Sequence, residues 1–273
     1  MRLEAVKDYR VLIVGDAILD RYVFVRPLGK SIKESVISVC HEREETYRGG
    51  VWAAAAHLAS LCAHVDVMHG PQIMLSTRYV EESGNRKLFT LHQVNEERPS
   101  ESFDIPSYDL VIVIDFGNGT MTPELIDRVS KEARFLAVNA QTNSTNFGFN
   151  LITRYRRADY VVIDELEARL AAQDRVSEIE DVIVKLGYRK IVVTLGRLGA
   201  VGFDGEFYRE PAKADRIVDT LGAGDAFLVV SALFAKAMFP IRDLVGIGNI
   251  AGAAKVGVVG HRRAIDRHDL RVA

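Results

Sequence analysis

The sequence has few cysteines, no long apolar run and little net charge, and each of these features excludes a class of protein. Its 273 residues include two cysteines, Cys40 and Cys62, without metal-ligand spacing, which favours reduced, structural thiols over a disulfide framework or a zinc site. No apolar run reaches the roughly 18 residues that predict a membrane span. The first eight residues lack the apolar core of a signal peptide. The net charge of -2 argues against a nucleic-acid footprint. We therefore expect a cytoplasmic protein that binds small molecules, with no nucleic acid and no membrane as partner.

Composition and patterning favour one α/β domain over residues 1–273. Hydrophobic residues make up 48% of the chain and charged residues 26%, which is enough apolar material for a large core. Short apolar runs that alternate with helical patterns predict parallel strands flanked by helices. These runs are 10–16, 64–68, 109–114, 135–138, 160–163 and 190–193. We therefore expect a mostly parallel central sheet.

Other segments alternate polar and apolar residues, which is typical of strands with one exposed face. They lie around 21–42 and 77–93, and the second pair flanks Gly84-Asn85. We interpret them as a small β-lid that projects from the body. A further hairpin around Asp204-Gly205 is predicted to have a type I′ turn. Ser177 is expected to cap the helix that ends near residue 186.

The stretch 217–227 is the strongest chemical signal in the chain. An apolar pair leads into a turn with Gly222 and Gly224, and a long apolar helix follows. Amide groups and the helix dipole make such an N-terminus an anion site. Asp225 in its first turn would repel a bound phosphate, which suits a general base that deprotonates an attacking hydroxyl. The alternative is a capping acid beside a tight turn.

Polar residues also follow the predicted strands, at the edge where open α/β sheets bind ligands. Asp16 and Asp115 each end an apolar run, and Asn139 opens a cluster of amides. As alternatives, Asp16 could form hydrogen bonds only within a turn, and the amide side chains could form hydrogen bonds with backbone groups of their own loop. In the lid, Arg78 could bind a substrate phosphate or be a surface arginine.

A second acidic pair, Asp164 and Glu167, follows the strand 160–163. Carboxylates at positions i and i+3 face the same side of a helix. Their oxygens suit Mg²⁺, often through water. The same pair fits a helix cap with an acidic first turn, and on the residues alone this interpretation is preferred.

Two motifs resemble a known family. Residues 219–225 read Asp-Thr-Leu-Gly-Ala-Gly-Asp, which resembles the C-terminal signature of the ribokinase-like (PfkB) carbohydrate kinases. Residues 15–22 read Gly-Asp-Ala-Ile-Leu-Asp-Arg-Tyr, which looks like the opening of the heptose-7-phosphate kinase branch of that family. The resemblance covers nearly the whole chain. It departs at Ala53, where the branch usually has Asn, and after about residue 70, where roughly one helix–strand unit is missing.

The resemblance implies a ribokinase-like fold and a set of site residues. The sugar would meet Asp16, Asp20 and the Gly49-Gly50 pair, and the lid would often serve as a homodimer contact. Asp225 would be the base, with the amides of Gly222, Ala223 and Gly224 stabilising the phosphoryl group. Glu167, with Asp164, would lie in the outer shell of Mg²⁺. The nucleotide side would comprise Thr194, Gly196, Gly199, Asp219, Thr220 and Asn249.

The implied enzyme is a sugar kinase with ATP and Mg²⁺ as cofactors. By resemblance its acceptor is a heptose 7-phosphate destined for nucleotide-sugar synthesis, and a separate nucleotidyltransferase partner would continue the sequence of reactions. Ala53 and the shortened segment keep another phosphosugar, hexose or nucleoside open as acceptor. With Asp164, which stands where the family has Asn, they also keep open a kinase-like binding protein with little turnover.

Overall fold

The computed structural model describes residues 3–96, 99–100, 102–214 and 216–271. Its body is built on an eight-stranded sheet with the strand order β12-β11-β10-β9-β8-β7-β1-β4. Six strands run parallel, and β11 and β12 are antiparallel at one edge. The strands are β1 (Arg10–Gly15), β4 (His64–Met68), β7 (Leu110–Asp115), β8 (Leu136–Ala140), β9 (Tyr160–Asp164), β10 (Ile191–Thr194), β11 (Ala200–Phe203) and β12 (Phe207–Glu210).

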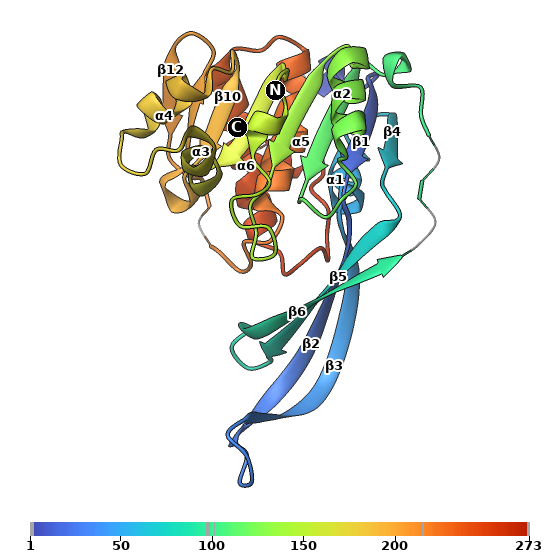
Figure 1. Cartoon of the computed structure of the whole chain (residues 1–273). Coiled ribbons are helices and arrows are strands. Elements are labelled where there is room, and N and C mark those ends of the chain that lie inside the picture. The colour runs from blue at the N-terminus through green and yellow to red at the C-terminus, as the bar shows by residue number, and fades with distance from the viewer. Residues whose placement is uncertain (1–2, 97–98, 101, 215, 272–273) are drawn as a thin grey trace.

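Helices cover both faces of this sheet (Figure 1). On one face lie α1 (Val51–Leu58), α5 (Ala223–Lys236) and α6 (Ile241–Val256), and on the other lie α2 (Pro123–Glu132), α3 (Glu165–Ala172) and α4 (Ile179–Leu186). The side chains of β7 are buried on both faces, as the continuous apolar run predicts. Five 3₁₀ turns complete the described chain: Leu3–Ala5, Ile105–Ser107, Ile152–Arg154, Gly196–Leu198 and Asp269–Arg271. The predicted mostly parallel central sheet with flanking helices is confirmed.

Helix α5 lies deep in the body and carries the residues of the glycine-rich motif at its N-terminus. Its side chains from Asp225 to Ala235 are buried. It packs closely on α6, because Gly248 offers only a hydrogen where a Cβ would lie 2.3 Å from the ring of Phe227. The apolar composition of both helices therefore fixes the position of the α5 N-terminus.

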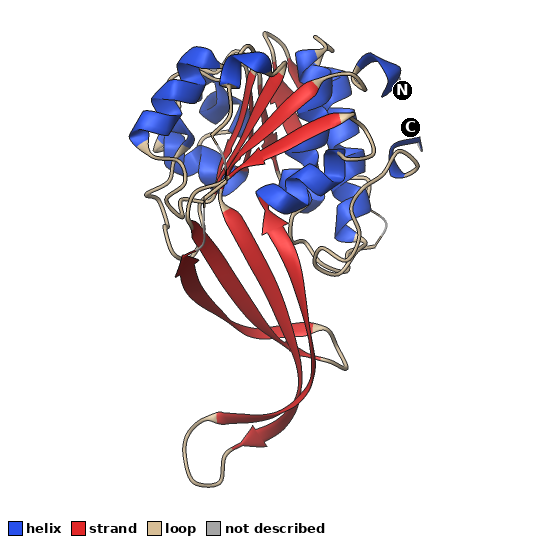
Figure 2. Cartoon of the chain, turned by 90° about the vertical axis from the view of Figure 1, so that its right-hand side faces the viewer, coloured by secondary structure: helices blue, strands red, loops and turns tan. Residues whose placement is uncertain are grey.

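The lid is a separate four-stranded sheet that projects from the body (Figure 2). Its order is β3-β2-β5-β6, with β2 at Ala17–Lys30, β3 at Ile37–Gly50, β5 at Gln72–Glu81 and β6 at Arg86–Glu96. The strands are longer than the alternating segments predicted. Only Asp16 separates β2 from β1, and β3 leads through Gly49-Gly50 directly into α1. The lid is therefore joined to the body where the central strands end.

Two local predictions are wrong. The β11–β12 hairpin has the three-residue loop 204–206, because Phe203 pairs with Phe207, and in it only Gly205 has a positive φ; a type I′ turn needs two such residues. Ser177 does not cap α4, whose N-cap is Glu178. Its hydroxyl donates instead to Asp174, 3.0 Å away.

The described part of the chain contains no helix of the length and apolarity that a bilayer crossing requires.

Candidate active site

The glycine-rich motif forms a turn that ends in the N-terminus of α5. Gly222 is the N-cap residue with φ 75°, a left-handed conformation that glycine adopts without strain. The amide of Ala226 donates to its carbonyl at 3.0 Å, which closes the first helical turn. Of the amides before it, that of Ala223 donates to the carbonyl of Thr220 at 3.3 Å, and the first amides of a helix otherwise have no acceptor within the helix. The local sequence therefore builds the anion site that its pattern predicts.

Asp225 is buried in the first turn of α5, with 6% of its surface exposed. Its Oδ1 accepts a hydrogen bond of 2.6 Å from Nε2 of Gln141, which follows β8. Burial raises the pKa of Asp225, and nearby His261, Gln141 and Lys255 act in the opposite direction. A raised pKa increases the proton affinity of the carboxylate, as a general base requires.

A cavity of about 880 Å³ opens beside this helix end, at the carboxyl ends of β8 to β10. Its volume lies within the usual range for ligand pockets. Gly196 and Gly199 have φ of 58° and 91° in its wall, so backbone rather than side chain faces a ligand there. The predicted residues that line it are Asn139, Asp164, Glu167, Thr194, Gly196, Gly199, Thr220, Gly222, Ala223, Gly224, Asp225 and Asn249. With Arg197 and Lys213 also in the wall, the cavity fits a polyphosphate nucleotide.

Asp164 and Glu167 form a capping box at the start of α3. Glu167 accepts from the amides of Asp164 at 2.8 Å and Thr142 at 3.0 Å, so both of its oxygens are used. Burial and the adjacent Asp164 raise the pKa of Glu167 to about 8. Within the described ranges, no three His, Cys, Asp or Glu side chains form a metal-binding group. The exposed Asp164 fits a hydrated Mg²⁺ that the phosphates hold, because this ion keeps several of its waters in proteins.

The predicted sugar side of the site centres on Asp20, in the first part of β2. Its carboxylate pairs with Arg78 from β5 and lies 3.2 Å from Nε2 of His261. Burial alone would raise the pKa of Asp20, but His261 and Arg78 hold it below its usual value. A Cβ on Gly49 would lie 2.2 Å from this carboxylate, so only glycine permits the approach. Arg78 is thus a buried partner of Asp20 and not a surface residue.

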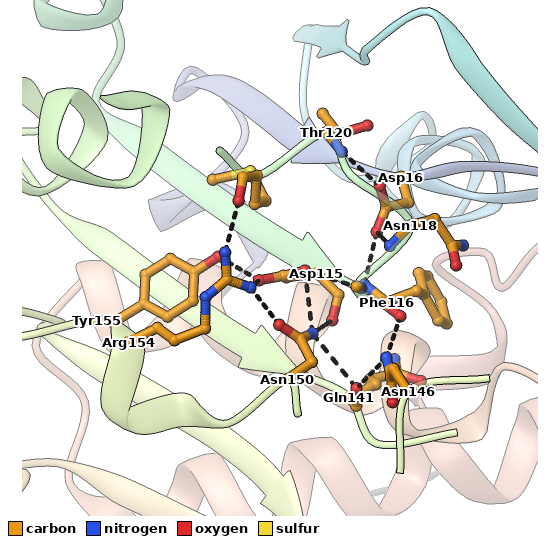
Figure 3. Close-up of polar contacts among 12 residues, drawn as sticks. Asp16, Asp115, Phe116, Asn118, Thr120, Gln141, Asn146, Asn150, Arg154 and Tyr155 are labelled. Carbon is orange, nitrogen blue, oxygen red and sulfur yellow. Dashed lines mark hydrogen bonds and ion pairs between the residues drawn. The ribbon is translucent and has the colours of Figure 1, made fainter. Parts of the chain in front are cut away.

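Asp16 and Asp115, which are predicted to contact the substrate, are held by partners within the chain (Figure 3). Asp16 has no exposed surface and accepts from the amides of Phe116, Asn118 and Thr120. Asp115, 1% exposed, accepts from Tyr155 at 2.7 Å and pairs with Arg154 at 3.1 Å. The bonds of Asp16 order the loop after β7, and those of Asp115 join the end of β7 to residues 154 and 155. The sugar contacts expected of both residues stay predictions.

Asp219 faces the lid and is not among the residues that line the cavity. Its carboxylate accepts from Tyr22 of β2 at 3.0 Å and from Lys87 of β6 at 2.8 Å. The amides of Leu221 and Gly260 also donate to it. The predicted nucleotide residue thus joins the glycine-rich turn to the lid. Gly50, with φ 58°, similarly lies against the carbonyl of Asp16 where the lid meets the body.

Three residues at the site are not among the predicted site residues: Gln141, Lys255 and His261. Gln141 lies in the polar cluster that the prediction centred on Asn139, whereas Asn139 itself donates to the carbonyl of Val162. Lys255 is the one charged residue in the apolar stretch 244–256 of α6, and that isolation is the signal that the sequence offers. Its Nζ donates to the carbonyls of Leu221 and Gly260, each at 2.7 Å. His261 offers no pattern, because its neighbours are distant in sequence.

Comparison with known proteins identifies the class. The sequence model described as pfkB family carbohydrate kinase matches residues 84–267, which is more than half of the chain. This chain belongs to the pfkB family of carbohydrate kinases. The predicted family and enzyme class are thereby confirmed.

Curated relatives and solved structures agree with this class. Bifunctional protein HldE of Campylobacter curvus is 23% identical over 94% of this chain and 64% of its own length. The protein of the same name from Desulfatibacillum aliphaticivorans is 24% identical over 96% and 62%. The chain thus spans less than two thirds of these relatives. Ribokinase from Thermotoga maritima superimposes with a TM-score of 0.71 at 15% identity, covering 96% of this chain and 98% of its own.

Proposed function

We propose that the chain transfers the γ-phosphoryl group of ATP to a sugar hydroxyl, most specifically that of a heptose 7-phosphate. The observation that carries this proposal is the position of Asp225. Its carboxylate lies at the helix end beside the glycine-lined cavity, and its pKa responds to Asp20 and His261 on the sugar side. A base between a nucleotide cavity and a sugar-side carboxylate is the arrangement that in-line transfer requires.

In the proposed reaction, each residue of the site has a separate task. Asp20 would accept a hydrogen bond from the sugar and so orient it. Asp225 would take the proton of the attacking hydroxyl while Gln141 holds the carboxylate in place. The amides of residues 222–224 would stabilise the negative charge that develops on the phosphoryl oxygens. Mg²⁺, held through water by Asp164, would neutralise phosphate charge when bound.

The acceptor is proposed from the sequence motif at residues 15–22 and from the similarity to proteins named HldE. Another phosphosugar, hexose or nucleoside is the alternative. It is favoured by Ala53 and by the direct passage from β4 to β5, which shortens the wall of the sugar side. A kinase-like binding protein is the second alternative, because Glu167 is already held by two amides.

We also propose that a second copy of the chain pairs with the lid. The β2–β3 tip exposes large apolar side chains, and β6 exposes a further set. These are Leu28, Ile32, Val36 and Ile37 at the tip, and Phe89, Leu91 and Val94 on β6. Contiguous exposed apolar groups mark interaction surfaces. A separate nucleotidyltransferase is proposed as the enzyme that uses the product.

The test is ATP consumption with Mg²⁺ across heptose 7-phosphates, hexoses and nucleosides. Asp225→Asn should lower kcat by about 10²-fold or more while nucleotide binding, measured by calorimetry, persists. Asp127→Asn on the exposed face of α2 is the matched control and should behave as wild type. Nucleotide binding without turnover on any acceptor would support the binding-protein alternative instead.

A further inference from the structure

Asp219 has an unusual concentration of donors for one carboxylate. Its Oδ1 accepts from Lys87 Nζ at 2.8 Å and from the amide of Leu221 at 3.2 Å. Its Oδ2 accepts from the hydroxyl of Tyr22 and the amide of Gly260, both at 3.0 Å. Two of these donors belong to the lid and two to loops of the body. The carboxylate is therefore a polar contact between the lid and the glycine-rich turn, beside the packing of Leu221 on the lid.

The charges around Asp219 make Lys87 its direct counter-ion. The Asp219 side chain is 4% exposed, and a buried carboxylate is costly unless it is paired and hydrogen-bonded. Burial would raise its pKa, but Lys87 and the two amides lower it to about 2. Lys255 also lies nearby, yet its Nζ donates to the carbonyls of Leu221 and Gly260. Lys87 is thus the ammonium group in hydrogen-bond contact with Asp219.

This contact reaches the anion site through a single residue, Leu221. Asp219 Oδ1 binds the amide of Leu221, and Lys255 binds the carbonyl of the same residue at 2.7 Å. Leu221 immediately precedes Gly222, the N-cap of α5. The orientation of the Asp219 carboxylate therefore affects where the amides of residues 222–224 point.

We propose that Lys87 is a positioning residue for phosphoryl transfer: with the lid closed, its ammonium group neutralises Asp219 and sets the glycine-rich turn in its catalytic geometry. This inference rests on the proposed kinase function. If Lys87 has this role, the geometry of the glycine-rich turn on the phosphate side depends on the position of the lid, which covers the sugar side. Turnover would then require both halves of the site to be assembled.

The neighbouring residue Arg86 provides a matched control. It lies on the same strand, and its guanidinium pairs with Glu81 within the lid at 3.2 Å. Replacing either cation by methionine removes one positive charge from β6 and keeps a long side chain. Only Lys87→Met removes the contact with Asp219.

The experiment measures kcat and KM for Lys87→Met, Lys87→Arg and Arg86→Met, with the acceptor that wild type uses. We expect Lys87→Met to lower kcat by about tenfold or more, since small misplacements of reacting groups carry such losses. Lys87→Arg and added methylammonium should each recover part of that loss. Equal kinetics for Lys87→Met and Arg86→Met, or a loss that neither arginine nor methylammonium recovers, would overturn the proposal.

A second measurement does not depend on activity. Hydrogen exchange of the amides in 219–224 should be faster in Lys87→Met than in Arg86→Met and wild type. If wild type phosphorylates no acceptor, the proposed function fails while this measurement still decides whether Lys87 orders the turn. Unchanged exchange in Lys87→Met would refute the coupling.

Discussion

The imidazole Nε2 of His261 lies 3.2 Å from Oδ2 of Asp20, so the loop after α6 contacts the sugar-side carboxylate of the lid. The other ring nitrogen, Nδ1, is buried and has no hydrogen-bond partner within the described residues. A Cβ on Gly222 would lie 3.0 Å from the same ring. One side chain thus lies beside both the sugar-side carboxylate and the helix cap of the phosphate side.

This position predicts a pH effect of His261→Phe. Burial raises the pKa of Asp225, and His261 opposes that rise. Without His261 the pKa of Asp225 should be higher, so less of the base is deprotonated at a given acidic pH. The acid limb of kcat/KM should therefore move to higher pH. His268→Gln, an exposed histidine of the same segment, is the control. A profile for His261→Phe that coincides with the control would contradict the prediction.

Glu167 predicts a pH dependence of stability. Its pKa is raised from 4.5 to about 8 in the folded protein, so the native state keeps a proton that the unfolded chain releases. The stability that this group contributes is complete below 4.5 and is lost as pH rises through about 8. In Glu167→Gln, the free energy of unfolding from urea titrations should fall less over this range. Glu165→Gln, whose side chain is 44% exposed, should keep the wild-type slope, and an unchanged slope in Glu167→Gln would count against the assignment.

Replacement by alanine is expected to change the free energy of unfolding in opposite directions at two glycines of α6. In Gly248→Ala the new Cβ would meet the Phe227 ring at 2.3 Å, which should cost about 1–3 kcal/mol of unfolding free energy through overpacking. In Gly252→Ala the nearest atom is the carbonyl oxygen of Ala223 at 3.8 Å. That variant should be neutral or gain up to about 1 kcal/mol from helix propensity. Chemical denaturation of both variants measures the difference, and equal stabilities would refute the packing argument.

The body of the fold could be predicted because its signals are local. A run such as 110–114 is apolar on every residue, and only a strand covered on both faces buries such a run at that length. The helix after Gly224 is apolar on all sides for the same reason. The hairpin loop at 204–206 escaped prediction because the residue count of a hairpin loop depends on strand register, and Asp-Gly fits loops of two or three residues.

The sequence indicates those residues of the candidate site that lie in one short motif. It does not indicate those that come together only through contacts between distant segments. Asp225 and the cavity-lining glycines follow from a contiguous pattern. Asp16 and Asp115 have the sequence signature of ligands at strand ends, and the sequence does not indicate that loop amides hold Asp16 or that Arg154 and Tyr155 hold Asp115. Lys87 and Asp219 are 132 residues apart, and no periodicity in either segment indicates that they meet.

The junction between β1 and β2 has a mechanical consequence. The amide of Asp16 donates to the carbonyl of Ile114, and the amide of Val51 donates to the carbonyl of Asp16, so both long lid strands are anchored at one point. From there β2 continues for 14 residues, a span on the order of 45 Å for an extended strand. A small rotation at this anchor displaces the far tip by many times the shift at Asp20. A partner that held the tip would thus restrict that rotation. Subunit association and sugar affinity would then be thermodynamically linked. Each would strengthen the other if the lid is closed in the paired state.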